Sequence, residues 1–169
     1  MANIVLTGFM GTGKTSVSRE LARMLGMKLI DADEEIERTQ KTAISEIFRL
    51  FGEQRFREIE TETLRTLAKE DKTIISTGGG AVLREENMKA LRENGMIFCL
   101  SASPETIYER TRHTTDRPLL NVDDPLARIR ELLNSRMPYY EKAGTMIDTE
   151  NKTPHQVAEE IARLFRCRT

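Results

Sequence analysis

The 169-residue chain has only two cysteines, no tryptophan and no excess of either charge. Cys99 and Cys167 are too few for a disulfide framework and lack metal-ligand spacing, which favours a reducing compartment. Lysine and arginine number 26 and aspartate and glutamate 27, which gives a formal net charge of -1. This balance argues against a polyanionic partner, so we expect no nucleic acid to bind.

Long apolar runs are also missing. None approaches the roughly 20 residues that a transmembrane helix requires. The N-terminus lacks the basic stretch, apolar core and cleavage site of a signal peptide. We therefore expect a cytoplasmic protein with no membrane partner. Internal repeats and linkers are absent too, and the length suits a single domain over residues 1–169.

What the chain does contain is an alternation of short apolar runs with longer amphipathic ones. Five short runs rich in isoleucine, valine and leucine lack regular polar alternation, which is typical of strands buried on both faces of a parallel sheet. We expect strands at residues 4–6, 28–31, 73–76, 96–100 and 145–147. The helical spacing between them predicts an α/β fold, with a central five-stranded parallel sheet flanked by helices.

Local signals mark where several helices begin or end. A helix over 15–25 should stop at Gly26, a residue suited to a helix C-cap, and apolar spacing predicts another helix over 52–69. Residues 113–123 are polar and lack helical periodicity, so we expect a long exposed loop there. Three further helices should begin where a capping side chain precedes a proline, at Ser103-Pro104, Asp124-Pro125 and Thr153-Pro154.

The most specific motif is GFMGTGKT at 8–15, which matches the phosphate-binding loop (P-loop) pattern G-x-x-x-x-G-K-[ST] in full. Backbone N–H groups of such a loop and the N-terminus of the next helix bind phosphate. Lys14 should reach the β- and γ-phosphates, and the Thr15 hydroxyl should bind Mg²⁺. A simple glycine-rich turn is the alternative, but the flanking strand and helix favour a nucleotide site. Further nucleotide contacts are expected from Gly11, Thr12, Gly13 and Ser16.

Polar residues also follow the next two strands, at the edge where open α/β sheets bind ligands. Asp31 and Asp33 could divide their tasks between the water shell of a metal and a substrate hydroxyl, or one could only cap a helix. Arg57 and Glu60 lie three apart on a helix and could hold a planar anion. Spacing alone, however, favours a surface ion pair of little consequence. The third strand is followed by a glycine triplet, Gly78, Gly79 and Gly80.

Six motifs together resemble shikimate kinases, a family of small-molecule kinases with a P-loop. They are GFMGTGKT at 8–15, DAD at 31–33, GEQRFREIE at 52–60, STGGG at 76–80, RPLL at 117–120 and RMPYYEKA at 136–143. Only the first is specific by itself, but the six follow the family's order along nearly the whole chain. The resemblance implies transfer of the γ-phosphoryl group of ATP to the 3-hydroxyl of shikimate, a step of aromatic amino acid biosynthesis.

The resemblance also implies roles on the acceptor side. Asp33 is expected to contact ring hydroxyls and to act as the base on the acceptor. Arg57 and Arg136 should clamp the substrate carboxylate, with Glu60 orienting Arg57. The backbone of the glycine triplet should approach the substrate closely. We expect the two tyrosines at 139–140 to pack behind Arg136.

On the donor side, the resemblance implies that Thr15 and Asp31 serve Mg²⁺, Asp31 through a water molecule. Residues 113–123 correspond to a mobile lid, from which Arg117 would reach the phosphates and help to exclude water. Without the other motifs, a solvated loop with an incidental arginine would be the simpler interpretation. The substrate-binding helical region would span about 33–61.

The adenine site is implied by two separate positions. Arg110 corresponds to an arginine that stacks on adenine, and Pro154 belongs to the loop on the other side of the base. The chain departs from the family pattern beside this proline, because Lys152 and Thr153 stand where many relatives carry an arginine.

Two alternative functions stay open at this point. One is another small-molecule kinase of the same fold, for gluconate or a nucleoside monophosphate, since a P-loop does not name the acceptor. Asp33 with Arg57 and Arg136 suits a compact polyhydroxy acid better than a nucleotide, which would require a base-reading pocket. The other is a nucleotide-binding module without catalysis. We expect a monomer.

Overall fold

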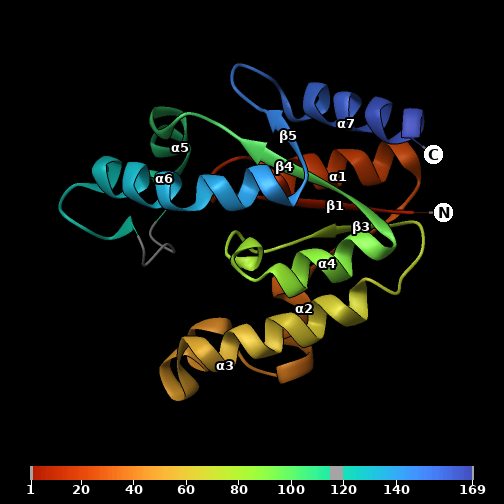
Figure 1. Cartoon of the computed structure of the whole chain (residues 1–169). Helices are drawn as coiled ribbons and strands as arrows, with labels where there is room; N and C mark the ends of the chain where they lie inside the picture. The colour runs from red at the N-terminus through yellow and green to blue at the C-terminus, as the bar shows by residue number, and fades with distance from the viewer. Residues whose placement is uncertain (1, 115–119, 169) are drawn as a thin grey trace.

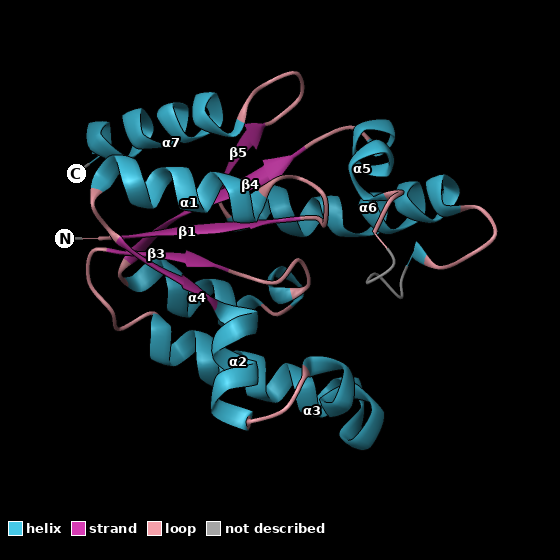
Figure 2. Cartoon of the chain, turned by 180° about the vertical axis from the view of Figure 1, so that it is seen from behind, coloured by secondary structure: helices cyan, strands magenta, loops and turns pink. Residues whose placement is uncertain are grey.

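The computed structural model of the chain describes residues 2–114 and 120–168. It has a central sheet with helices on both sides (Figure 1 and Figure 2). Across these residues, no helix is long and apolar enough to cross a membrane. The elements in chain order are β1 (Asn3–Gly8), α1 (Lys14–Leu25), β2 (Lys28–Asp31), α2 (Ala32–Gln40), α3 (Ile44–Leu67), β3 (Thr73–Ser76), the 3₁₀ helix η1 (Ala81–Leu83), α4 (Glu85–Glu93), β4 (Gly95–Ser101), α5 (Pro104–Thr111), α6 (Pro125–Ala143), β5 (Thr145–Asp148) and α7 (Pro154–Arg168).

The five strands form one parallel sheet in the order β2-β3-β1-β4-β5. The predicted sheet is confirmed, and each strand lies within two residues of its expected bounds. β1 is the middle strand, where Leu6 pairs with Ser76 of β3 and with Phe98 of β4. Because all strands run the same way, their carboxyl ends meet at one edge. The P-loop leaves the sheet at the centre of that edge.

The expectation that every strand is buried on both faces is wrong for the two outer strands. β1 and β3 are buried throughout, whereas most residues of β2 and β5 are exposed or half-buried. An outer strand has a neighbour on one side only, and the helices cover the middle of the sheet more completely than its margins. A short apolar run carries no information about which place it takes in the sheet.

The core has two layers because side chains of a strand alternate between the faces of the sheet. Ile4 and Leu6 of β1 pack in a cluster with residues of α1 and α7, and Val5 between them packs in a cluster that includes residues of α4 and α6. Each such fully buried side chain contributes about 1.5–3 kcal/mol to stability. Cys99 is buried in the second cluster, and Cys167 is exposed.

The helix signals are confirmed wherever a cap defines them. Gly26 adopts the left-handed conformation after α1, with φ 61°. The capping oxygens at the other ends accept bonds from backbone N–H groups three residues later, in the pairs Ser103–Thr106, Asp124–Ala127 and Thr153–Gln156. These caps fix where α5, α6 and α7 begin, and therefore where their loops reach the edge of the sheet.

The helix predicted over 52–69 is only the second part of a longer one. α3 begins at Ile44 and bends sharply at Gly52, whose φ of 78° and ψ of 174° are not helical. No described atom lies within 4 Å of the position that a Cβ of Gly52 would take, so the backbone angle and not space requires glycine there. The bend lets α2 and both parts of α3 enclose a small apolar cluster of their own, formed by Ile36, Ile47, Phe56 and Ile59.

The expected loop over 113–123 is described only at its ends. Residues 113–114 and 120–123 contain no α-helix or strand, in agreement with the prediction. Arg117 lies outside the described residues, so its expected contact with the phosphates stays a prediction.

Candidate active site

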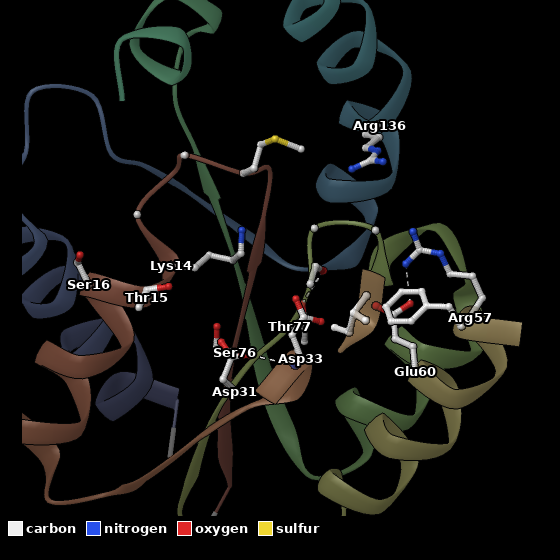
Figure 3. Close-up of a pocket in the computed structure, with 18 of the residues that line it drawn as sticks. Lys14, Thr15, Ser16, Asp31, Asp33, Arg57, Glu60, Ser76, Thr77 and Arg136 are labelled. Carbon is white, nitrogen blue, oxygen red and sulfur yellow. Dashed lines mark hydrogen bonds and ion pairs between the residues drawn. The ribbon is translucent and has the colours of Figure 1, made fainter. Parts of the chain in front are cut away.

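A cavity of about 530 Å³ lies at the carboxyl edge of the sheet. Lys14, Thr15 and Ser16 lie on one side of it and Arg57 and Arg136 on the other, with Asp33 between them (Figure 3). The structure therefore brings the expected phosphate site and the expected acceptor site into one space. The predicted site residues that line this cavity are Gly11, Gly13, Lys14, Thr15, Ser16, Asp31, Asp33, Arg57, Gly78, Gly79, Gly80, Arg110 and Arg136.

The P-loop is held in shape by its own side chains. The Thr12 hydroxyl donates to the Phe9 carbonyl at 2.7 Å. The Lys14 ammonium donates to the carbonyls of Gly8 at 2.7 Å and Phe9 at 3.1 Å. Gly13 takes a left-handed conformation directly before α1, so the first N–H groups of that helix open toward the cavity. Backbone dipoles and one lysine thus supply the positive potential that a polyphosphate requires.

Asp31 and Asp33 make different contacts, although only one residue separates them. Asp31 Oδ1 accepts bonds from the N–H groups of Asp33 at 2.9 Å and Glu34 at 3.2 Å, which caps α2. The capping alternative is therefore confirmed for Asp31, which also lines the cavity. Asp33 lies in the first turn of α2 and points toward the space between Lys14 and the arginines (Figure 3).

The environment of Asp33 makes it a better proton acceptor than an ordinary aspartate. Its pKa is raised from 3.8 to about 6, chiefly by burial and further by the negative charges of Asp31 and Glu60. The positive charges of Lys14 and Arg57 oppose this shift. A carboxylate with this pKa is still ionised at neutral pH, yet it binds a proton more readily than an exposed one. These are the properties expected of a general base.

Arg57 and Glu60 form a buried ion pair, so the interpretation as a surface pair is wrong. Arg57 Nη1 donates to Glu60 Oε2 at 2.7 Å, and only 2% of the Glu60 side chain is exposed. Burial raises the pKa of Glu60, and the positive charge of Arg57 opposes that shift. Glu60 Oε1 is buried without a hydrogen-bond partner among the described residues. The spacing of three residues could not reveal this burial, which depends on the packing of α3 against the glycine triplet.

Two glycines of the triplet lie in close contact with three charged side chains. A Cβ on Gly80 would lie 2.5 Å from Arg57 Nη2, closer than real Cβ contacts allow. A Cβ on Gly78 would lie 3.1 Å from Asp33 Oδ1 and 3.3 Å from Glu60 Oε1. The bare backbone after β3 therefore forms the floor on which the acceptor groups converge.

Arg136 enters the cavity from α6, on the side opposite Asp33 (Figure 3). Its guanidinium carbon lies 5.7 Å from the centre of the Phe9 ring, in cation–π range. The expectation that two tyrosines pack behind it holds for one of them only. Tyr140 is 2% exposed, whereas Tyr139 is 47% exposed. Adjacent helical residues point about 100° apart, so both could not face the same side.

Three apolar side chains of α3 were not anticipated as site residues. Ile44, Phe48 and Phe56 line the cavity from the two parts of α3. The rings of Phe48 and Phe56 lie 4.7 Å apart, and the Arg57 guanidinium carbon is 5.2 Å from the Phe56 ring centre. Their spacing in the sequence is that of an ordinary core face, and Phe56 does belong to the small core. Only the bend at Gly52 turns this face toward the cavity.

The expected adenine residues lie around a second, neighbouring cavity of about 270 Å³. Arg110 donates to the carbonyl of Gly11 at 3.2 Å, the hydroxyl of Thr149 at 3.1 Å and the carbonyl of Thr149 at 3.3 Å. It thereby connects the P-loop with the loop that follows β5. Lys152, at the position that departs from the family pattern, forms an ion pair with Glu160 of α7 at 2.9 Å. Predicted residues that line this cavity are Thr12, Gly13, Ser16, Arg110 and Pro154.

Comparison with known proteins gives concordant results along the chain. The shikimate kinase family model matches residues 10–166. The chain is 55% identical over 165 residues to the shikimate kinase of Thermodesulfovibrio yellowstonii, covering 98% of this chain and 95% of that protein. It is 46% identical over 161 residues to that of Caldicellulosiruptor bescii, covering 95% and 94%.

Solved structures agree with the sequence matches. The shikimate kinase of Acinetobacter baumannii in complex with shikimate superposes with a TM-score of 0.93 at 36% identity, covering 100% of this chain and 95% of that one. A gluconokinase from Sinorhizobium meliloti, with a TM-score of 0.58 at 18% identity, shares the fold alone. The chain therefore belongs to the shikimate kinase family.

Proposed function

We propose that this protein transfers the γ-phosphoryl group of ATP to the 3-hydroxyl of shikimate, giving shikimate 3-phosphate and ADP. The observation that carries the proposal is the convergence of Asp33, Arg57 and Arg136 on the cavity that the P-loop opens into. A small acid with ring hydroxyls needs a cationic clamp, a proton acceptor and a phosphate donor at close range. The cavity contains groups suited to all three.

On the acceptor side, Arg57 and Arg136 bind the carboxylate of shikimate. Guanidinium groups bind carboxylates in a planar, bidentate manner that a lysine cannot reproduce. With the acid fixed, the ring extends toward Asp33, which accepts the proton of the 3-hydroxyl as its oxygen attacks the γ-phosphorus. The bond from that phosphorus to the bridging oxygen of ADP breaks, and ADP leaves.

On the donor side, the P-loop backbone and Lys14 bind the phosphates, and Arg110 and Pro154 enclose adenine. Arg117, on a lid formed by residues 113–123, adds a further positive charge as the lid excludes water. Water is a competing acceptor, so its exclusion favours transfer over hydrolysis. The helical region of about 33–61 takes up the acceptor.

The residues present fit a Mg²⁺ ion. Thr15 and Asp31 place a hydroxyl and a carboxylate on the same cavity as Lys14. The described residues hold no group of three histidines, cysteines or carboxylates that could enclose a metal. Mg²⁺ suits such a site, because it keeps several waters and takes few protein ligands beside the phosphates. We propose that Thr15 binds it directly and Asp31 through water. When bound, Mg²⁺ neutralises charge on the β- and γ-phosphates.

The test is ADP release by the full chain with ATP, measured with shikimate, gluconate and AMP as acceptors. We expect turnover with shikimate only, in the presence of Mg²⁺, and its loss when the metal is chelated. Turnover with gluconate or AMP but not with shikimate would overturn the proposal. ATP binding without turnover of any acceptor would instead support a non-catalytic module. We further propose a cytoplasmic monomer, for which size-exclusion chromatography with light scattering checks the oligomeric state.

A further inference from the structure

We propose that Tyr140 is a positioning residue for the acceptor, because its hydroxyl holds the glycine triplet and both arginines of the carboxylate clamp in register. The inference rests on the proposed function, since it concerns how the same clamp is built. Tyr140 lies behind the cavity wall and does not line the cavity itself. Its effect on the reaction must therefore pass through other residues.

The central contact is a hydrogen bond between distant parts of the chain. The Tyr140 hydroxyl donates to the carbonyl of Gly79, the middle residue of the triplet, at 2.7 Å. The ring is among the largest fully buried side chains of the described residues. Burial raises the pKa of Tyr140 to about 12, so the hydroxyl remains a donor throughout the pH range in which enzymes work. Over this pH range the bond can therefore join α6 to the loop after β3.

Arg136, one turn earlier on α6, also lies close to Gly79. Residues four apart share a face of a helix, so both side chains reach the triplet from the same side. A Cβ on Gly79 would lie 3.6 Å from the Tyr140 hydroxyl oxygen and 3.8 Å from Arg136 Nη1. The glycine thus sits against the hydroxyl and one clamp guanidinium at once.

The second arginine of the clamp packs against the next residue of the triplet. Gly80 leaves no room for a side chain beside Arg57, and Glu60 holds that guanidinium from behind. A displacement of Gly79 would move Gly80 and with it the space in which Arg57 lies. One hydroxyl therefore fixes the distance between the two guanidinium groups, which the two oxygens of a carboxylate require to within a fraction of an ångström.

α6 has a specific need for such a tether. Pro138 lies inside the helix between Arg136 and Tyr140, and a proline cannot donate the backbone bond of its turn. The turn that carries Arg136 is thereby weakened within the helix. Tyr140 lies on the next turn of the helix, and its bond to Gly79 holds the turn that carries Arg136 in place.

The experiment compares Tyr140→Phe with Tyr139→Phe, the same chemical change at the exposed neighbour. We expect Tyr140→Phe to raise the KM for shikimate roughly five- to thirtyfold, because the Gly79 carbonyl loses its donor and is no longer held in place. The KM for ATP and kcat should stay within about twofold of the wild type. Tyr139→Phe should change none of these values. Thermal melts of both variants set an assay temperature at which each is folded.

A shikimate analogue with a carboxamide in place of the carboxylate separates positioning from general damage. For this analogue, the ratio of dissociation constants between Tyr140→Phe and wild type should be close to one, because the clamp no longer grips an anion. An unchanged KM for shikimate in Tyr140→Phe would overturn the inference and leave the proposed function standing. An equal rise in the KM for shikimate and the KM for ATP would do the same. A wild-type protein without shikimate turnover would overturn the proposed function, and the inference with it.

Discussion

The donor half and the acceptor half of the site are built by the chain in opposite ways. The phosphate-binding part of the donor half is one continuous run, residues 8–15 from the end of β1 into α1, and much of its binding capacity comes from backbone N–H groups. The acceptor half collects single side chains from α2, both parts of α3 and α6, together with the backbone of the triplet after β3. The strand order β2-β3-β1 brings α2, α3 and the triplet beside the P-loop, and β4, on the other side of β1, precedes the segment that contains α6.

This difference explains what each half encodes. A continuous loop of backbone donors binds any nucleoside triphosphate and therefore occurs with many acceptors. Side chains that come from several elements can be substituted one at a time. We therefore expect them to determine which acceptor the site binds. If this view is right, substitutions in the two halves should affect different kinetic constants.

Asp33→Asn should have the largest effect, because Asp33 lies where the halves meet. We expect kcat to fall roughly 10²- to 10⁴-fold, the range for loss of a general base, with both KM values changed only a few-fold. ADP release under saturating substrates measures this. Near-normal turnover would show that the acceptor hydroxyl needs no base here and that the junction between the halves lies elsewhere.

Lys14→Ala should damage the donor half alone. Removing one preorganised charge at the phosphates should lower kcat/KM for ATP roughly 10²- to 10³-fold. The dissociation constant for shikimate without nucleotide should stay within about twofold. A comparable loss of shikimate affinity would mean that the two halves are not separable.

Arg57→Lys should damage the acceptor half alone. The charge beside Glu60 is kept, so no buried carboxylate is left unpaired, but the bidentate fork is lost. We expect the KM for shikimate to rise roughly ten- to a hundredfold while the KM for ATP stays within about twofold. Arg55→Lys, whose partner Glu58 is exposed, is the matched control and should behave as wild type.

The pH dependence should also belong to the acceptor half. Because the pKa of Asp33 is about 6, kcat/KM for shikimate should fall about tenfold per pH unit below that value. In Asp33→Asn, the residual activity should not show this decline. A wild-type profile that stays flat down to pH 5 would contradict the proposed role of Asp33.

The smallest effect concerns the free energy of unfolding of Asp33→Asn, which we expect to rise although the activity of this variant falls. The folded-state pKa of Asp33 lies above its ordinary value of 3.8, so its ionised form destabilises the fold above about pH 6, and this penalty disappears as the pH falls toward 4. Asp33→Asn should therefore be more stable than wild type by about 1–3 kcal/mol at pH 7. Denaturant unfolding at pH 7 and pH 5 should show this difference narrowing at the lower pH.

The same contrast governs what the sequence could predict. The five strands, the P-loop and the proline-linked caps depend on neighbouring residues, and the structure confirms them. The start of α3, the bend at Gly52 and the burial of Glu60 depend on packing between segments, and no local pattern revealed them. The six motifs did bring together Asp33, Arg57 and Arg136, because resemblance to a family carries tertiary information that spacing alone lacks.

The missed residues follow the same rule. Ile44 and Phe48 have the spacing of a core face, and only the backbone angle at Gly52 turns them toward the cavity. Tyr139 and Tyr140 are identical neighbours, and the phase of the helix buries Tyr140 in the core and exposes Tyr139. In each case the residue type indicated an apolar or aromatic contact, but the sequence did not show toward which part of the molecule the side chain points.

The most direct test of the two-half account is calorimetric titration of each ligand alone. Wild type, Lys14→Ala and Arg57→Lys would each be titrated with shikimate and, separately, with a non-hydrolysable ATP analogue. We predict a crossed result, in which Lys14→Ala loses affinity for the analogue only and Arg57→Lys for shikimate only. Equal losses for both ligands in either variant, or wild-type shikimate affinity in Arg57→Lys, would contradict it.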